Sequence, residues 1–342
     1  MTSSDTPSAD SSRLAVLDGW RGISILLVLA CHLLPLGPKS WQLNDTAGPM
    51  GMALFFTLSG FLITRFLVEH SSITDFLIRR FFRIVPLAWL AMLVVLLMDG
   101  APWSSVLPNF LFYANLPPQH LTDVGSHLWS LCVEVQFYVG VALLVRLLGR
   151  RGLLLLPLLC VAITIHRIMV GAPVDIVTWR RGDEILAGAM LALAYGGSWG
   201  AWPARLLVRA NPYLLFLLLA LCSHPALEAL NYLRPYVAAT LVGATLYAPP
   251  VRLAALLGSR TLAYVAAISF ALYVIHHILM YSWLGEGDKL IRYAKRPLLI
   301  AATFLLAHLS TFYFEQRCIG LGKRLSATLR SRRATPLEKV AS

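Results

Sequence analysis

A series of apolar runs, each close to 20 residues long and separated by short polar segments, limits this chain to one broad fold class. About 20 apolar residues in a helix cross the hydrocarbon layer of a membrane, which is about 30 Å thick. Only 13% of the 342 residues are charged, about half of the fraction typical of soluble domains. The sequence therefore predicts an all-α, polytopic transmembrane helical bundle within the lipid bilayer.

Ten spans can be drawn from these runs, and an even number puts both termini on one side of the membrane. The predicted spans are 17–36, 49–69, 83–98, 127–148, 152–170, 183–199, 206–222, 235–250, 262–283 and 297–315. About two thirds of the 29 Lys and Arg fall with the tails and the even-numbered loops, as expected of the cytoplasmic side. The Arg180–Arg181 pair and the cluster from Lys289 to Arg296 are left outside, against this rule. The sixth and eighth spans are short and contain Gly, which leaves a tilted or re-entrant element open there.

Little of the chain lies outside the bundle. We expect residues 1–12 to form a disordered cytoplasmic tail, 13–325 the transmembrane domain, and 326–342 a basic cytoplasmic tail on anionic lipid headgroups. The placement of the basic residues argues against nucleic acid as a partner. The five cysteines show neither disulfide nor metal-ligand spacing, and we expect no metal site. The external connection 99–126 contains no Lys or Arg, and we expect it to form a lid or line a pocket.

Arg21 and His32 lie eleven residues apart in the first run, LDGWRGISILLVLACH. At about 100° and 1.5 Å per residue they share a helix face and lie roughly 16 Å apart along the axis. With Arg21 at the cytoplasmic edge, His32 lies near the middle of the membrane, where an imidazole is costly to keep. This cost favours a functional His32. The structural alternative is that Asp18 pairs with Arg21 while His32 hydrogen-bonds a neighbouring helix.

A second basic group, RRFFR, precedes the third span. Arg80 and Arg83 are three residues apart and project from one helix face. An isolated basic patch of this kind often holds anionic lipid. Beside Arg21, however, paired guanidinium groups are suited to grip the phosphates of a cytosolic donor.

The fourth span opens with HLWSLCVEVQFY, in which His127, Glu134 and Tyr138 share one helical stripe. A carboxylate two turns into a membrane costs about 2–3 kcal/mol unless it is paired or hydrated. Glu134 is therefore either a structural partner of a membrane-edge arginine or a catalytic group. His127, Trp129 and Asp18 are the candidates for substrate binding.

Further polar groups lie in later spans, at Tyr273, His276, His277, His308 and Glu315. A glutamate beside a histidine would orient the imidazole, although each of these groups alone is often an interhelical hydrogen-bond partner. Ser59 in FFTLSGFLIT is more typical of a close-packing position than of a nucleophile.

These residues together are suited to acyl transfer from a thioester such as acetyl-CoA. The phosphates of the thioester would bind Arg80, Arg83 and Arg21, and its pantetheine arm would enter the bundle. His32 would deprotonate an acceptor hydroxyl that arrives from outside. Tyr273 or a second histidine would stabilise the oxyanion, and a two-step route through an acyl-enzyme remains open. The candidate catalytic residues are His32, Glu134, Tyr273, His276 and Glu315.

The segments named above resemble, in order, those of the membrane-bound acyltransferase family 3, a family of bacterial integral-membrane O-acyltransferases. The similarity extends over about residues 14–325 and is carried by LDGWRGISILLVLACH, FFTLSGFLIT, RRFFRIVPLAWL, HLWSLCVEVQFY, ISFALYVIHH and FYFEQR. The resemblance implies about ten spans and an acyl-CoA donor, usually acetyl-CoA, with no permanently bound cofactor. It also implies that Arg21 and His32 are essential, and it matches family positions at Arg80, Arg83, His127, Trp129, Ser130, Glu134 and Glu315.

The chain departs from the family pattern at a few positions. Ser24 replaces a common Ala, and Val135 replaces a Glu that in relatives follows the position of Glu134. Many relatives also carry an extracytoplasmic hydrolase-like domain after the bundle. We therefore expect either a separate extracytoplasmic partner protein or an acceptor small enough to reach the bundle.

The expected function is O-acylation, most simply acetylation, of a cell-surface or exported carbohydrate or glycolipid in the bacterial cytoplasmic (inner) membrane. One alternative is acylation, including succinylation, of a small glycosylated metabolite or lipid. Another is a transporter or flippase for a lipid-linked sugar, with His and Glu relaying protons. Transporters often contain inverted repeats, and the sequence shows no such symmetry.

Overall fold

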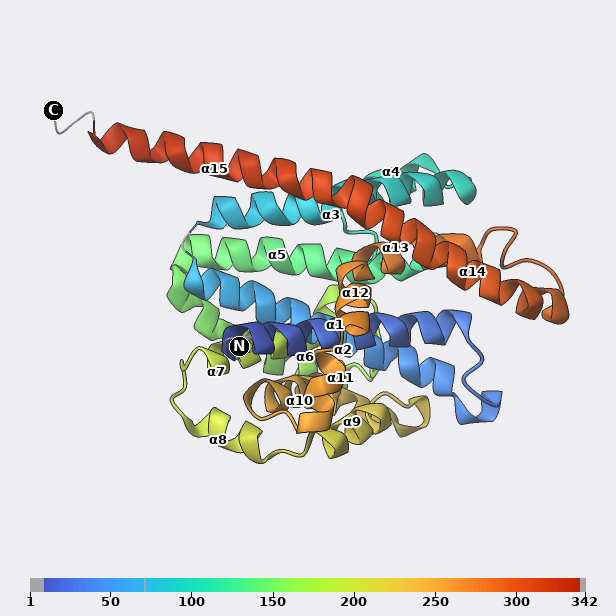
Figure 1. The fold of residues 1–342 in the computed structure, drawn as a ribbon, viewed down its shortest axis with the longest axis horizontal. Helices are drawn as coiled ribbons and strands as arrows, with labels where there is room; N and C mark the ends of the chain where they lie inside the picture. The colour runs from blue at the N-terminus through green and yellow to red at the C-terminus, as the bar shows by residue number, and fades with distance from the viewer. Residues whose placement is uncertain (1–8, 71, 339–342) are drawn as a thin grey trace, which may run out of the picture.

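The computed structural model describes residues 9–70 and 72–338, and throughout these residues the secondary structure is helical, without strands (Figure 1). The all-α prediction is confirmed over this range. The helices are α1 (Ala9–Leu33), α2 (Leu43–Glu69), α3 (Ile73–Met98), α4 (Trp103–Phe110), α5 (Trp129–Leu148), α6 (Leu156–Met169), α7 (Asp183–Tyr195), α8 (Trp202–Arg209), α9 (Pro212–Leu221), α10 (Arg234–Tyr247), α11 (Val251–Leu257), α12 (Arg260–Ala267), α13 (Ser269–Met280), α14 (Lys289–Leu309) and α15 (Gln316–Glu338).

The core of the bundle is built around α2, which packs most extensively against α1 and α7. Helix α1 also contacts α10, α11, α12 and α13, so the first helix lies inside the bundle for much of its length. Large apolar side chains such as Trp20, Phe56 and Phe61 are fully buried between these helices. This packing holds α1, and with it Arg21 and His32, in a fixed position.

The close approach of α2 and α7 depends on two glycines. A Cβ atom at Gly60 would lie 1.8 Å from the carbonyl oxygen of Ile185, and one at Gly188 would lie 2.0 Å from that of Thr57. Small residues let helix backbones meet in this way inside a membrane. The interpretation of the Ser59–Gly60 pair as a close-packing position is confirmed.

We predict that Gly60→Ala destabilises the protein by about 1–3 kcal/mol, because the added methyl group must push two backbones apart. The measurement is the midpoint of thermal unfolding in detergent, which should fall. Gly140→Ala on α5 is the matched control, since no described heavy atom lies within 4 Å of its added Cβ atom. Equal midpoints for the two variants would show that the contact does not limit packing.

Within residues 9–70 and 72–338, six helices are long and apolar enough to cross a membrane, and the number of spans rises to as many as nine if each bent helix pair counts as one. The sixth predicted span, 183–199, corresponds to α7, which has only 13 residues and is about 20 Å long. Helix α7 is almost entirely buried by its neighbours. Because it does not face lipid, it can be shorter than a lipid-facing span. The structure therefore does not confirm ten straight spans, because α7 is too short to be counted among the six to nine candidates.

Three later predicted spans are bent rather than straight. Helices α8 and α9 meet at 86°, the segment Pro225–Tyr247 and α11 at 103°, and α12 and α13 at 65°. The second bend lies at the end of the predicted eighth span, one of the two spans where the sequence left a tilted or re-entrant element open. At the third bend both helices, α12 and α13, contact α1.

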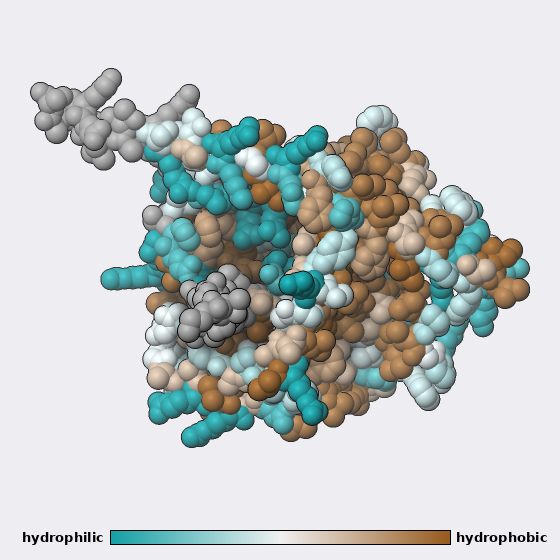
Figure 2. Space-filling model, in the orientation of Figure 1, coloured by the Kyte–Doolittle hydropathy of each residue, from teal (hydrophilic) through white to brown (hydrophobic). Residues whose placement is uncertain are grey.

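The surface agrees with a protein that lies in a membrane. The face shown in Figure 2 is hydrophobic across its middle and hydrophilic at its left, with a further hydrophilic patch at the right margin. Many large apolar side chains on α3, α5 and α6 are exposed, for example Leu97, Leu147 and Leu158. Such an apolar surface is suited to lipid tails, and the chain is a multi-pass membrane protein.

The structure describes part of each predicted tail. Residues 1–8 lie outside the described residues, and α1 already includes residues 9–12. At the other end, the helix continues from α14 through a π-helical segment, Ser310–Glu315, into α15, so the segment 326–338 is helical.

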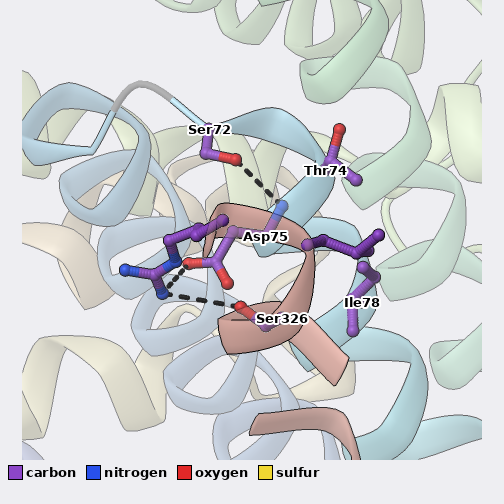
Figure 3. A pocket seen from close by; sticks show the side chains of 7 residues that line it. Ser72, Thr74, Asp75, Ile78 and Ser326 are labelled. Atoms are coloured by element: carbon purple, nitrogen blue, oxygen red, sulfur yellow. Dashed lines mark hydrogen bonds and ion pairs between the residues drawn. The ribbon is translucent and has the colours of Figure 1, made fainter. Parts of the chain in front are cut away.

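Helix α15 packs along α3, and an ion pair joins the two helices. Asp75, in the first turn of α3, accepts hydrogen bonds from Arg79 at 3.1 Å and from Arg330 at 2.8 Å. Figure 3 shows Asp75 on α3 facing Ser326 on α15, while the Ser72 hydroxyl accepts from the Asp75 amide. The beginning of the predicted basic tail is thus fixed to the bundle.

Candidate active site

Four histidines from three parts of the chain meet in one cluster. His32 lies near the end of α1, His276 and His277 lie on α13, and His127 lies in the 3-10 turn Ser126–Leu128. The ring centroid of His32 is 5.1 Å from that of His276 and 5.5 Å from that of His277. The centroid of His127 is 4.5 Å from that of His277. The structure therefore joins three candidates, His32, His127 and His276, and adds His277.

Backbone carbonyl groups determine which ring nitrogens carry protons, because a carbonyl oxygen can only accept. His276 Nδ1 lies 2.7 Å from the Tyr273 oxygen, so Nδ1 is protonated and Nε2 has a lone pair. That Nε2 atom lies 3.3 Å from His32 Nδ1, which also lies 3.0 Å from the Val28 oxygen. His32 Nδ1 is therefore the donor to both acceptors. The Nε2 atom of His32 keeps its lone pair, as a general base requires.

The hydroxyl group of Tyr273 is not free to stabilise an oxyanion, as the sequence suggested it would be. Its hydroxyl donates to the carbonyl oxygen of His127, and it lies 2.5 Å from the Ser130 hydroxyl. A phenol has one proton, so Ser130 is the donor in the second bond. In this arrangement Tyr273 has no proton left for an oxyanion. The imidazole of His127 is buried, and neither of its nitrogens has a hydrogen-bond partner among the described residues, so it remains as a donor.

The cluster faces a cavity of about 640 Å³. Its wall includes His32, His127, His277, Trp129 and Tyr273. Part of the long connection 99–126 also lines it, through Gln119, Leu121, Thr122, Asp123 and Ser126. The prediction that this connection lines a pocket is confirmed. A cavity of this size holds a drug-sized ligand or a sugar unit.

The arginines meet at the opposite end of α1. Arg21, Arg80 and Arg83 surround a cavity of about 40 Å³. Arg80 and Arg83 also line a neighbouring pocket of about 220 Å³, together with Arg79 of α3 and Lys323 of α15. The predicted cluster of these three arginines is thus present, and α15 adds a further cation to it.

A narrow cavity of about 20 Å³ lies between the arginines and the histidines. It shares Phe55 and Ser269 with the arginine cavity. It shares Val28, Met52 and Tyr273 with the histidine cavity. The cavities therefore form a series along α1 that leads from a basic pocket to an imidazole cluster, and its narrowest part is mostly apolar.

The predicted pairing of a glutamate with a histidine is wrong for the described residues. Glu134 accepts hydrogen bonds from Ser59 at 2.6 Å and from Tyr138, and it lines the arginine cavity. Glu315, in the π-helical segment, accepts from Thr311 at 2.8 Å. The backbone carbonyl groups of α1 and α13, rather than carboxylates, orient the imidazoles.

The third predicted substrate residue, Asp18, does not join the other two. It lies 3.8 Å from Arg21, at the arginine end of α1. His127 and Trp129 line the histidine cavity instead. The structural alternative for Asp18, an ion pair with Arg21, is the arrangement that is present.

The sequence did not single out Arg181, which also lines the histidine cavity. It belongs to a buried ionic cluster with Glu184 and Arg234, next to the ion pair of Arg167 with Asp183. Its position in an external loop, against the charge rule that places basic residues inside, was a sequence signal for a special role. The described residues contain no group of three or more His, Cys, Asp or Glu arranged to hold a metal ion.

Comparison with curated proteins gives relatives with a common chemistry. Acyltransferase MdmB of Streptomyces mycarofaciens is 29% identical over 40% of this chain and 41% of its own length. The putative peptidoglycan O-acetyltransferase YrhL of Bacillus subtilis is 27% identical over 88% of this chain and 54% of its own length. The peptidoglycan O-acetyltransferase OatA of Listeria monocytogenes is 29% identical over 36% of this chain and 22% of its own length. The chain spans about half or less of these relatives.

No solved structure matches the chain significantly. A family model described as an acyltransferase domain matches residues 14–315, which is most of the chain. This match confirms the resemblance noted from the sequence motifs. The chain belongs to this acyltransferase family, the membrane-bound acyltransferase family 3.

Proposed function

We propose that the protein is an O-acyltransferase that carries an acyl group, most simply acetyl, from cytosolic acyl-CoA to a carbohydrate hydroxyl on the other side of the membrane. The observation that supports this proposal is the series of cavities between the two ends of α1. One end is lined by cations and the other by imidazoles, and the cavity between them has a volume of only about 20 Å³. An anionic cofactor with a thioester arm matches this order of a cationic end and an imidazole end, and its arm would widen the middle cavity as it enters.

The proposed placement in the membrane follows from the contrast between the arginine end and the histidine end of α1. The arginine end lies in the cytoplasm with both termini, and the histidine cavity opens to the outside of the bacterial cytoplasmic membrane. Helix α7 then counts as a tenth, buried crossing, which fits about ten spans. The transmembrane domain covers residues 13–325, and α15 brings its basic residues to the cytoplasmic lipid surface.

The donor would be held by Arg80, Arg83 and Arg21. Guanidinium groups bind phosphate oxygens through forked hydrogen bonds, and none of these three has a carboxylate closer than the 3.8 Å contact of Arg21 with Asp18 among the described ion pairs. Glu134 and Glu315 would act as positioning groups for this basic region rather than as catalytic acids.

The chemistry would take place at His32. Its Nε2 atom accepts the proton of the acceptor hydroxyl as the oxygen attacks the thioester carbon. The His127 imidazole donates to the resulting oxyanion. When the C–S bond breaks, the thiolate of CoA takes the proton from the His32 imidazolium, and the ester remains on the acceptor. His276 positions His32, because its Nε2 atom accepts from His32 Nδ1.

The acceptor would be a sugar of an exported or surface glycan, or of a glycolipid. Trp129 offers an aromatic face in the histidine cavity, and polar side chains such as Asn44 and Gln119 line the same cavity. Two of the relatives are named as peptidoglycan O-acetyltransferases, one of them putative, which supports a carbohydrate as the class of acceptor.

The test of this function is acetyl-CoA-dependent release of free CoA by the purified protein. We predict that Ser269→Phe, which places a ring at the junction of the arginine and narrow cavities, lowers the release by about tenfold or more, because a misplaced thioester loses its attack geometry. Ser269→Ala is the matched control and should retain activity. Transport of a sugar without CoA release, or equal rates for the two variants, would contradict the proposal.

A further inference from the structure

Arg181 is a buried cation that faces the histidine cavity. Only 1% of the residue is exposed, yet it is part of the cavity wall. It follows the 3-10 turn Thr178–Arg180 and precedes α7, so the packing of α7 in the bundle fixes its position. Its guanidinium group lies 5.3 Å from the ring centroid of Trp129, which lines the same cavity.

The ionic cluster around Arg181 has one positive charge in excess. Arg167 pairs with Asp183, and both side chains are fully buried. Glu184 is shared by Arg234 at 2.7 Å and by Arg181 at 3.3 Å. Three guanidinium groups therefore face two carboxylates. A buried excess charge is costly unless another anion compensates it.

Arg181 also has N–H donors without acceptors. Its Nε and Nη1 atoms are buried and have no hydrogen-bond partner among the described residues. A guanidinium group carries five N–H donors, and leaving buried donors unpaired is unfavourable. The unpaired donors belong to a side chain of the cavity wall, and because both atoms are shielded from the open part of the cavity, a ligand there would pair with them after a small shift of the side chain.

The carboxylates of the cavity do not compensate this charge. Asp175 already accepts from the amides of Ile176 and Val177 and pairs with Arg180 at 3.2 Å. Asp45 and Asp123 are exposed side chains of the cavity wall, and no ion pair joins either of them to Arg181 among the described residues. Arg181 is thus a cation whose missing partner is not supplied by the protein.

We propose that Arg181 and Trp129 form a subsite for an anionic group, a carboxylate or a phosphate, of the molecule that enters the histidine cavity. The guanidinium group binds the anion through two N–H donors, and the indole ring packs against the attached sugar. The inference rests on the proposed function only in treating this cavity as the acceptor side. It adds that the acceptor is acidic, or that the acyl group itself ends in a carboxylate, as succinyl does.

The test is a binding measurement by equilibrium dialysis, with purified protein in an uncharged detergent at constant ionic strength. The probes are methyl glucuronide, methyl glucoside, which is its neutral counterpart, and inorganic phosphate. We expect the protein to bind glucuronide and phosphate and to bind glucoside at least tenfold more weakly. Arg181→Gln should weaken the binding of both anions by about tenfold to a hundredfold, the range of a charge-assisted hydrogen-bond pair.

Two variants control this result. Arg181→Gln leaves Arg234 with Glu184 and Arg167 with Asp183, so no carboxylate loses its last partner and the variant should fold. Arg181→Lys keeps the charge, and anion binding should fall only a few-fold. Lys39→Gln removes an exposed positive charge outside the cavity wall and should bind both anions like the wild type.

Further measurements identify which molecule carries the anion, and they separate a failure of this inference from a failure of the proposed function. Faster release of CoA from succinyl-CoA than from acetyl-CoA, lost in Arg181→Gln, would assign the anion to the acyl group, whereas glucuronide binding assigns it to the acceptor. Equal binding of glucuronide by the wild type and by folded Arg181→Gln, or no binding of any anion, would overturn the inference. Because binding is measured without turnover, this failure is distinct from an absence of CoA release.

Discussion

His32→Ala is expected to lower acyl transfer by about 10²- to 10⁴-fold, the contribution of a general base. The variant loses the Nε2 lone pair that faces the histidine cavity, while Val28 and His276 lose only a shared donor. The His32 side chain is exposed to the cavity rather than packed in the core, so the protein should still fold. The measurement is the rate of acetyl-CoA-dependent acceptor acylation at saturating donor and acceptor.

His308→Ala serves as the control for this experiment. His308 lies on α14, where it hydrogen-bonds Tyr264 at 3.0 Å and does not line the histidine cavity. The same type of substitution is thus made at a position away from the cluster. The transfer rate should stay within a few-fold of the wild type. Undiminished turnover in His32→Ala would remove His32 from the mechanism.

The double variant Arg80→Gln with Arg83→Gln is expected to raise the apparent KM for acetyl-CoA by about 10²-fold or more. Each guanidinium–phosphate contact is a charge-assisted hydrogen bond that contributes about 1.5–3 kcal/mol. The two side chains line both cavities at the arginine end, whereas the histidine cavity lies beyond the narrow cavity. The KM for the acceptor should therefore change little.

Arg146→Gln with Arg150→Gln is the matched control, since both side chains are exposed at the end of α5 and just after it. It removes the same charge from the same side of the membrane, and its donor KM should stay close to that of the wild type. If both double variants raise the donor KM equally, the effect is a general loss of positive charge and the clamp is wrong.

The sequence predicted those parts of the site that depend on helical spacing. Arg21 and His32 lie on one helix, so their separation follows from the rise of an α-helix alone. Arg80 and Arg83 share a face for the same reason. That these arginines meet Arg21, and that His276 meets His32, depended on which helices pack together. Single-chain periodicity does not give that information, and only the shared membrane edge placed Arg80 and Arg83 beside Arg21.

Other parts could not be predicted because they depend on packing or on local irregularity. Chemical type suggested that a glutamate orients a histidine without showing which one, and nearby hydroxyl groups instead donate to the carboxylates of Glu134 and Glu315. The π-helical segment that contains Glu315 and the short buried α7 have no periodicity signal. The sequence marked Arg181 only as an exception to the charge rule, and its burial beside a cavity depends on how the bundle packs.

The most direct test of the account uses proteoliposomes in which all molecules have one orientation, with acetyl-CoA supplied on one side only and the acceptor sugar on the other. The account predicts that free CoA appears on the side of Arg80 and Arg83 and that the acetylated sugar appears in the opposite compartment. Ser269→Phe should reduce both products together. Equal acylation when donor and acceptor are both confined to the histidine side would contradict transfer through the bundle.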